Sequence, residues 1–355
     1  MMKLIVLSTN RPEKLQIPLQ TTSLNYEFYP LNKNITSLSY WKTLLSAMYI
    51  SLNNDYDAIL CTGGGLVGVM TIGMSFVTSL DSLIRLNGNP LQSNREARRR
   101  ALQDKAVIRY IGYYAIHLSN VIAIKYSDGV LTVSSQLKNE IIGMRNDTSV
   151  EFVPIHVNIY GEPVKTKGCT DGLQILTVTN LGFEGKYQGV KKSVDRLQPF
   201  LRKQNEVNYV IAGGGRYLGD LQNYIQSLDE DVKGNIEVKG YVSQIINIYE
   251  NSDIFLYISY IDGYPNVILE AQYAKLPIIS NRNHGMIDQI SHMEDGFLVN
   301  PDLSDFEKYM SELLEDSELR EKFSQKAHET VVRRNSPKKI GANIEEKIHK
   351  MVAAS

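Results

Sequence analysis

Two carboxylates, Asp262 and Glu270, flank the stretch of the 355-residue chain that is best suited to chemistry, Asp-Gly-Tyr-Pro-Asn-Val-Ile-Leu-Glu. The apolar run before it, at 253–259, has the length of a buried strand. Pro265 suits the first position of a helix, where a backbone N–H has no intrahelical partner. The pattern predicts a strand, a short loop and a helix whose N-terminal N–H groups can bind a phosphate or diphosphate. A purely structural role remains an alternative, in which Asp262 caps the helix and Glu270 faces solvent.

Three further strand ends carry groups that suit an anionic ligand. Three glycines at 213–215 precede Arg216, and glycine lets a ligand approach the backbone closely. The spacing of these glycines is not that of a dinucleotide fingerprint. Lys186, in a predicted loop, can meet a phosphate as a point charge. Gly240 and Tyr241 end another strand, where the backbone could meet a nucleobase. Each feature taken alone also fits a tight turn or an exposed loop lysine.

Short apolar runs alternate with helical segments along the chain, which predicts an α/β fold with parallel sheets and right-handed crossovers. A polar, glycine-containing stretch at 161–172 is the expected linker. We expect two Rossmann-like domains, at 1–165 and 172–335, with a terminal helix at about 336–355 packing back onto the first. Strands are expected at 3–7, 58–61, 82–86, 129–133, 151–154, 173–178, 208–212, 236–239, 254–258, 277–280 and 297–299, and the main helices at 66–76, 136–144, 190–202, 218–228, 245–250, 267–274 and 305–314.

Composition excludes several classes of protein. A net charge of −1 gives no overall field that would attract nucleic acid. No run of about 18 uninterrupted apolar residues occurs, so no membrane-spanning helix is expected. The N-terminal apolar run is short and lacks a cleavage site, so we interpret it as a strand rather than a signal peptide. Cys61 and Cys169 lack metal or redox spacing and are expected to be free thiols of a cytoplasmic protein.

The order of these features resembles that of a glycosyltransferase of the GT-B fold, most similar to glycosyltransferase family 4 (glycosyl transferases group 1). That family shows two Glu residues separated by seven positions, followed by a characteristic helix and strand, and residues 262–280 follow this pattern over nineteen positions. The downstream segments at 285–288 and 295–299 match as well. The resemblance is specific over about 173–300 and loose over 1–165. It implies two Rossmann-like domains facing a central cleft.

The resemblance also implies roles for individual residues. Glu270 would accept hydrogen bonds from ribose hydroxyls, and Asp262 would bind donor sugar hydroxyls and support positive charge at the anomeric carbon. Lys186, helped by Arg216, would offset phosphate charge. Transfer would retain the anomeric configuration and need neither metal nor cofactor, the nucleotide-sugar being a substrate. The implied donor-binding set is Gly214, Arg216, Gly240, Tyr241, Gly263, Tyr264, Asn266, Val267 and Glu270.

The chain departs from the family pattern at several positions. Asp262 stands where the family has Glu, which shortens the reach by one methylene, and Lys186 lacks the usual preceding Arg. Many members carry a His in the first domain, and here Asn87 or Arg85 takes its place. Asn87 therefore joins Asp262 and Lys186 in the implied catalytic set.

The first domain is expected to hold the acceptor, a glycan or a lipid-linked sugar. A basic cluster at 95–100, with Lys105 and Arg109, fits a solvated face or attraction to an anionic membrane, so peripheral association with the inner membrane face stays open. The apolar segment at 106–125 is expected to be a core helix. Two other functions remain open, a sugar-nucleotide epimerase or hydrolase and a non-catalytic nucleotide-sugar-binding subunit. The sequence sets neither the sugar, the base, the acceptor linkage nor the oligomeric state.

Overall fold

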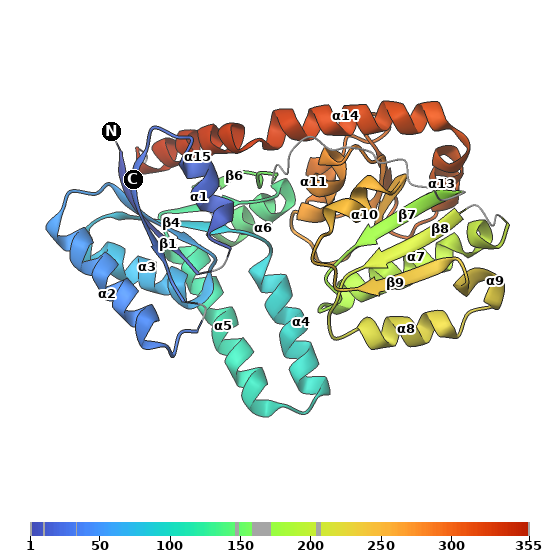
Figure 1. Cartoon of the computed structure of the whole chain (residues 1–355). Coiled ribbons are helices and arrows are strands. Elements are labelled where there is room, and N and C mark those ends of the chain that lie inside the picture. Colours follow the sequence, from blue (N-terminus) through green and yellow to red (C-terminus); the bar gives the residue numbers. More distant parts are fainter. Residues whose placement is uncertain are drawn as a thin grey trace. The chain divides into compact units, whose positions relative to one another are not determined.

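A computed structural model describes residues 2–9, 11–32, 34–145, 149–157, 172–203 and 207–353. The chain divides into two compact units (Figure 1). The N unit comprises Met1–His156 and Ser336–Ser355, and the C unit comprises Val157–Asn335. The predicted linker, apart from Gly172, and Cys169 lie outside the described residues.

The N unit is built on a six-stranded parallel sheet in the order β2-β1-β3-β4-β5-β6. Its strands are β1 (Lys3–Ser8), β2 (Asn25–Pro30), β3 (Ala58–Thr62), β4 (Asp81–Leu86), β5 (Gly129–Thr132) and β6 (Val150–Phe152). Its helices are α1 (Glu13–Leu19), α2 (Leu38–Asn53), α3 (Gly65–Thr78), α4 (Pro90–Gln103), α5 (Val107–Tyr126), α6 (Ser135–Arg145) and α15 (Pro337–Val352).

The C unit repeats this architecture with the order β12-β11-β10-β7-β8-β9, again all parallel. Its strands are β7 (Leu173–Val178), β8 (Val207–Ala212), β9 (Ile236–Gly240), β10 (Ile254–Tyr257), β11 (Ile278–Asn281) and β12 (Phe297–Val299). Its helices are α7 (Glu184–Lys203), α8 (Leu218–Gln226), α9 (Glu230–Lys233), α10 (Ile246–Glu250), α11 (Asn266–Tyr273), α12 (Met286–Gln289), α13 (Phe306–Glu315) and α14 (Ser317–Asn335).

Helices cover both faces of each sheet, because alternate strand residues point to opposite faces and both sets are apolar. In β1, Leu4 and Val6 pack with α1 and α15, whereas Ile5 and Leu7 pack with α2, α3, α5 and α6. The terminal helix α15 lies on α1, where a methyl group added at Gly341 would come within 2.5 Å of the Pro18 carbonyl oxygen. The expected α/β class with two Rossmann-like halves is confirmed.

Several elements differ from the sequence expectation, which did not include the helices α1, α2, α9, α12 and α14. The edge strand β2 was not predicted, since its half-exposed residues end in a proline and lack a clear apolar run. Helix α7 begins at Glu184, six residues before the expected start at 190. The prediction that 106–125 is a core helix is wrong, because only 17% of the most apolar window of α5 is buried.

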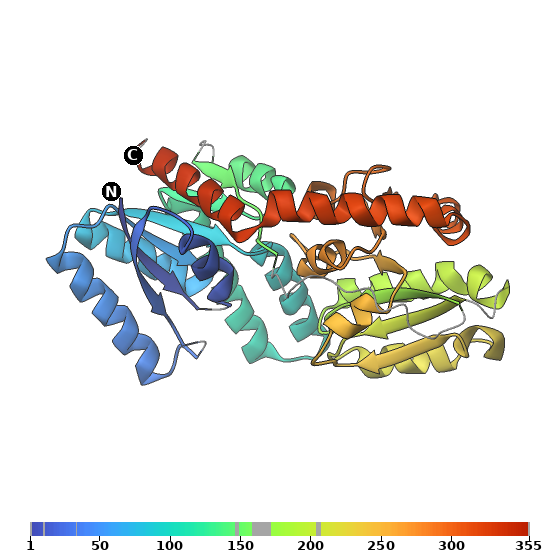
Figure 2. The same cartoon turned by 45° about the horizontal axis from the view of Figure 1, so that its top comes forward.

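Helices α4 and α5 run side by side as a hairpin that extends from the N-unit sheet (Figures 1 and 2). By length and composition alone, α5 is long and apolar enough to cross a membrane, in contrast to the sequence expectation.

Candidate active site

The C-unit sheet reverses its strand order at β7 and β10, which are parallel neighbours, with Ile254 opposite Ile175. β8 and β9 continue from β7 to one side, whereas β11 and β12 continue from β10 to the other. Open α/β sheets bind ligands at the carboxyl ends of the strands at such a switch point. The segment after β7 leads into α7 and the segment after β10 leads into α11, so both helix N-termini follow this edge of the sheet.

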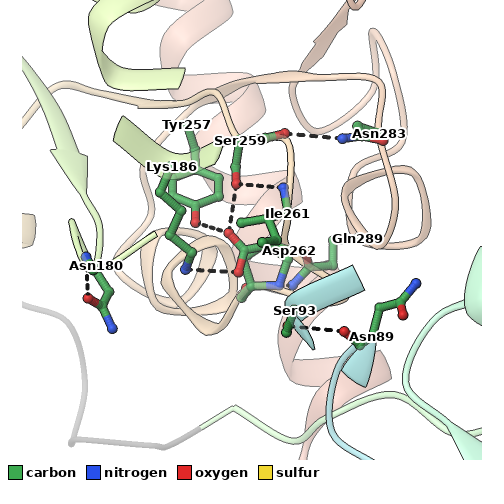
Figure 3. A network of polar contacts seen from close by, with 12 residues as sticks. Asn89, Ser93, Asn180, Lys186, Tyr257, Ser259, Ile261, Asp262, Asn283 and Gln289 are labelled. Atoms are coloured by element: carbon green, nitrogen blue, oxygen red, sulfur yellow. Dashed lines mark hydrogen bonds and ion pairs between the residues drawn. The ribbon is translucent and has the colours of Figure 1, made fainter. Parts of the chain in front are cut away.

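Two predicted site residues meet at this edge in an ion pair. Lys186 Nζ lies 2.9 Å from Asp262 Oδ1, and the two side chains are only 15% and 16% exposed. The other carboxylate oxygen, Oδ2, accepts hydrogen bonds from the hydroxyls of Tyr257 and, at 2.9 Å, Ser259 (Figure 3). Lys186 is therefore in the first turn of α7, not in a loop as predicted, and its ammonium contacts the acid directly.

This network controls the protonation of Asp262. Burial by itself raises the pKa of the carboxyl, but the Lys186 ammonium and the hydrogen bonds from Tyr257, Lys186 and Ser259 outweigh it, so the pKa lies below its ordinary value. Burial and the neighbouring Asp262 raise the pKa of Tyr257 well above its usual range, so this phenol acts as a donor. The site thus contains a fixed, ionised carboxylate beside a fixed cation.

Two glycines bring α7 close enough for the ion pair to form. A methyl group at Gly189 would lie 1.8 Å from the Ile258 carbonyl oxygen, and one at Gly185 would lie 3.3 Å from Ile261 Cβ. The first turns of α7 therefore rest directly on the backbone that follows β10. Lys186 lies between these glycines in sequence, so the close approach carries its side chain to Asp262.

Amide side chains from neighbouring elements hold the segment at 258–265. Asn281 at the end of β11 accepts from the Ser259 N–H at 3.0 Å and donates to its carbonyl oxygen at 2.9 Å. Gln289 donates to the Pro265 carbonyl oxygen at 2.9 Å, just before α11 begins. Sequence reasoning missed these partners as well as Tyr257 and Ser259. The available signal was the position of these polar residues, since Ser259 lies two residues after β10 and Asn281 ends β11.

Glu270 lies on α11 and lines a cavity of about 300 Å³. Its Oε2 accepts a hydrogen bond from the Tyr249 hydroxyl at 3.0 Å. The cavity is mainly apolar, and residues 243–246, shortly after β9, form part of its lining. The predicted site residues Gly240, with a φ of 65°, and Tyr241, which is 83% exposed, precede this segment and are not among the lining residues. The lining residues are Ser243, Gln244, Ile245, Ile246, Tyr249, Glu270 and Tyr273.

Packing accounts for two of the three glycines that follow β8. Gly213 and Gly215 have φ values of 151° and 147°, and methyl groups there would lie 1.7 Å from the Thr179 carbonyl oxygen and 2.2 Å from the Leu181 carbonyl carbon. These glycines let the loops after β7 and β8 pack backbone against backbone, a role that the sequence interpretation as a ligand approach did not include. The predicted site residue Gly214 is less constrained, since a methyl group there would make an ordinary contact with Tyr241.

The remaining residues that were predicted to bind the donor sugar-nucleotide differ in how far they are buried. The Tyr264 side chain is 6% exposed and its hydroxyl accepts from Asn335 Nδ2 at 3.0 Å, so this side chain holds the end of α14, and its contact with the donor stays a prediction. Asn266 and Val267 form the half-buried first turn of α11 after Gly263 and Tyr264, and Pro265 is the N-cap rather than the first helical residue.

Arg216 precedes α8 as an exposed residue, and its guanidinium lies over the Tyr217 ring, 5.2 Å from the centroid. The structure records no contact that joins Arg216 to the Lys186 and Asp262 pair among the residues it describes. Its predicted help to Lys186 therefore stays a prediction.

In the N unit, Asn87 lines a hollow of about 150 Å³ at the carboxyl ends of β3 and β4, together with Gly63, Gly64 and Asn89. Arg85, the other residue considered there, is 1% exposed and donates from Nη2 to the Pro154 carbonyl oxygen at 3.0 Å. Burial lowers its pKa to about 10. Asn87 is thus the open position of the two.

Comparisons with known proteins agree with this geometry. Residues 165–330 match the family of glycosyl transferases group 1. The capsular polysaccharide biosynthesis glycosyltransferase CapM of Staphylococcus aureus is 22% identical over 338 residues, 89% of this chain and 82% of that protein. The Escherichia coli UDP-Gal:α-D-GlcNAc-diphosphoundecaprenol α-1,3-galactosyltransferase is 33% identical over 106 residues, 30% of this chain and 27% of that protein.

Among solved structures, Anabaena HepE in complex with UDP and glucose is similar, with a TM-score of 0.70 at 15% identity over 99% of this chain and 100% of that one. At this identity the likeness shows the fold, which is the GT-B fold. The cleft expected between the two domains stays a prediction. The chain is a glycosyltransferase of the GT-B fold, and its match to the family of glycosyl transferases group 1 covers residues 165–330.

Proposed function

We propose that the chain transfers a sugar from a nucleotide-sugar to a glycan or lipid-linked acceptor, with retention of anomeric configuration and without a metal ion, as in glycosyltransferase family 4. The observation that carries this proposal is the ion pair of Lys186 and Asp262 at the switch point of the C-unit sheet, four residues before α11 begins. Glu270, just over one turn into that helix, borders the cavity described above.

The donor is proposed to bind with its nucleoside in the cavity beside Glu270. The apolar lining suits a nucleobase, and the carboxylate suits two ribose hydroxyls, because a charged acceptor makes stronger hydrogen bonds than a neutral one. Tyr249, which now donates to Glu270, holds the carboxylate in position. UDP is the first nucleotide to test, since it appears in the Anabaena complex and in the name of the E. coli relative.

Bond breaking at the anomeric carbon leaves an electron pair on the nucleoside diphosphate. In this proposal the Lys186 ammonium and the N–H groups in the first turn of α11 stabilise that charge, a form of electrostatic catalysis that needs no bound metal. Asp262, held ionised by its partners, lies near the anomeric carbon and supports the positive charge that develops there. The three contacts that fix Asp262 compensate for its shorter side chain by fixing its orientation.

The acceptor is proposed to bind the N unit at the hollow lined by Asn87. The name of CapM supports a role in polysaccharide biosynthesis, and that of the E. coli relative supports an acceptor linked to a lipid through a diphosphate. A cytoplasmic location at the inner membrane face belongs to the same proposal.

The test is a transfer reaction with purified full-length protein, UDP-sugars, a polyprenyl-diphosphate-linked sugar acceptor and EDTA, analysed by NMR of the product. The expected product has the anomeric configuration of the donor. An inverted product, or activity that disappears with EDTA, would contradict the mechanism. Epimerised or hydrolysed donor without transfer would support the epimerase or hydrolase alternative. Binding without turnover across the donor and acceptor panel would support a non-catalytic subunit.

A further inference from the structure

Helix α5 is apolar but exposed, whereas an apolar helix in the core of a globular protein is mostly buried. Its twenty residues are apolar enough to cross a membrane, yet only 17% of the most apolar part of the helix is buried. Ile108 is 88% exposed, Val107 68% and Ile111 61%. The buried residues of α5, Asn120, Ala123 and Ile124, all lie near its C-terminal end, and none of residues 107–119 is buried although the helix packs against α3 and α4. Exposed apolar surfaces of this extent mark interaction sites.

The same hairpin concentrates positive charge. Residues 90–126 contain seven Lys and Arg against two Asp and Glu, a net charge of +5 in a chain whose total is −1. Arg95 and Arg99 on α4 are exposed, as is Lys105 in the turn. Arg109 is 69% exposed in its side chain and lies one position after Ile108. The end of the hairpin thus presents apolar and cationic side chains together.

Neighbouring helices extend the apolar surface. α3 packs against α5, and α2, α3 and α5 cover the same face of the N-unit sheet (Figures 1 and 2). Phe76 on α3 is 91% exposed, and Leu38 and Tyr49 on α2 are 70% and 68% exposed. The helices that cover this face of the N-unit sheet therefore carry further exposed apolar side chains besides those of the hairpin.

We propose that the α4–α5 hairpin docks the N unit on an anionic lipid surface. Ile108, Ile111 and Val107 enter the boundary between headgroups and acyl chains, while the arginines and Lys105 contact anionic headgroups. The hairpin lies at the interface rather than spanning the bilayer, because α4 runs beside α5 with four arginines and α5 leads directly into β5 of the sheet.

A second copy of the chain fits this surface less well. A symmetric pairing through the hairpin would place two segments of net charge +5 against each other, and like charges across an interface oppose association. An anionic membrane supplies the complementary charge. This inference does not depend on the donor sugar or on the transfer mechanism.

The test is flotation of the full chain with vesicles of phosphatidylcholine alone or mixed with phosphatidylglycerol. The wild-type chain is expected to float with the anionic vesicles and to be released by high salt. Ile108→Gln/Ile111→Gln and Arg99→Gln/Arg109→Gln are each expected to weaken binding by about tenfold or more. Val332→Gln, an exposed apolar position of the C unit, is the matched control and is expected to bind like the wild type.

Nucleotide binding, measured in parallel, is expected to be unchanged in all these variants, which separates this proposal from the donor-site proposal. Failure of the wild-type chain to float on anionic vesicles at low salt would overturn it. So would equal flotation of the hairpin variants and the wild type. A wild-type dimer, seen by light scattering, that Ile108→Gln/Ile111→Gln converts to a monomer would assign the surface to a second copy instead.

Discussion

Each unit buries a cation near the carboxyl edge of its sheet, but the two cations have different partners. In the C unit, Lys186 is 15% exposed and pairs with Asp262 at 2.9 Å. In the N unit, Arg85 is 1% exposed and donates to a carbonyl oxygen at 3.0 Å. Within the part of the chain that the structure describes, its Nε and Nη1 have no hydrogen-bond partner.

The difference is that the buried cation of the C unit is paired with a carboxylate, whereas that of the N unit is hydrogen-bonded to a neutral carbonyl group. A buried cation with a well-oriented carboxylate is compensated, whereas a buried guanidinium without one costs free energy. The Lys186 and Asp262 pair belongs to the unit with the specific family resemblance, and Arg85 belongs to the unit where the resemblance is loose. The two cations should therefore respond in opposite ways to removal.

The largest effect is expected from Lys186→Met. Sugar transfer should fall by roughly 10²–10³-fold, because the departing diphosphate loses its cation. Initial rates at saturating donor and acceptor measure this change. Lys192→Met, an exposed position on the same helix over the Tyr260 ring, serves as the control and should keep its activity. Equal losses in the two variants would remove Lys186 from the mechanism.

The close approach of α7 can be tested with its two glycines. Gly189→Ala should lower the free energy of unfolding by about 2–3 kcal/mol, since its methyl group would meet the Ile258 carbonyl oxygen at 1.8 Å. Gly185→Ala should lower the free energy of unfolding by less than about 1 kcal/mol, because its methyl group would lie 3.3 Å from the nearest atom, Ile261 Cβ. Urea titration of both variants measures the difference. Equal stabilities would mean that α7 does not rest on this backbone.

Asp262→Asn should lower the free energy of unfolding at pH 7 by about 1–2 kcal/mol, because it removes the charge that pairs with Lys186. The pKa of Asp262 is lowered in the folded chain, so the folded carboxylate binds a proton more weakly than the unfolded one. Its contribution is thus complete above the unfolded pKa of about 3.9 and is lost as the pH falls through the folded pKa. Urea titrations between pH 7 and pH 3 test this, and a pH-independent difference would argue against the ion pair.

The smallest effect is expected from Arg85→Met. The free energy of unfolding should change by less than about 1 kcal/mol or should rise, because an apolar side chain of similar length removes an uncompensated buried charge. Lys186→Met should instead destabilise the chain by leaving Asp262 unpaired. Thermal unfolding of the two variants makes the comparison. A large loss of stability in Arg85→Met would mean that the guanidinium has a counter-ion in the folded protein.

Much of the fold could be predicted from the sequence because parallel strands buried on both faces read as short apolar runs. β1 and β10 are such runs, since all their residues except Lys3 are buried. β2 could not be found this way, since edge position leaves its residues half-exposed. The start of α7 was missed because Gly185 and Gly189 suggest a loop, although each serves a close contact of the helix.

The charged residues of the candidate site could be predicted from the sequence, but the residues that hold them in position could not. Asp262 and Glu270 follow from their spacing, but the meeting of Lys186 with Asp262 depends on strand order, which the sequence does not state. The Tyr257 hydroxyl reaches Asp262 only because β10 ends where it does. The hydrogen bond between Tyr264 and Asn335 could not be predicted either, because the two residues are 71 positions apart in the sequence.

In the proposed function, the C unit binds a nucleotide-sugar through Glu270 and the switch-point edge without a metal ion. Titration calorimetry of the wild-type chain and Glu270→Ala with UDP, GDP, ADP and CMP, all in EDTA, tests it most directly. We expect one of these nucleotides to bind selectively in the presence of EDTA. Glu270→Ala should weaken that binding by at least about tenfold, because the hydrogen bonds to the charged carboxylate are lost. Tyr249→Phe, which keeps the carboxylate, should weaken binding less. Equal affinity of Glu270→Ala and the wild type, or no binding of any of these nucleotides, would contradict the claim.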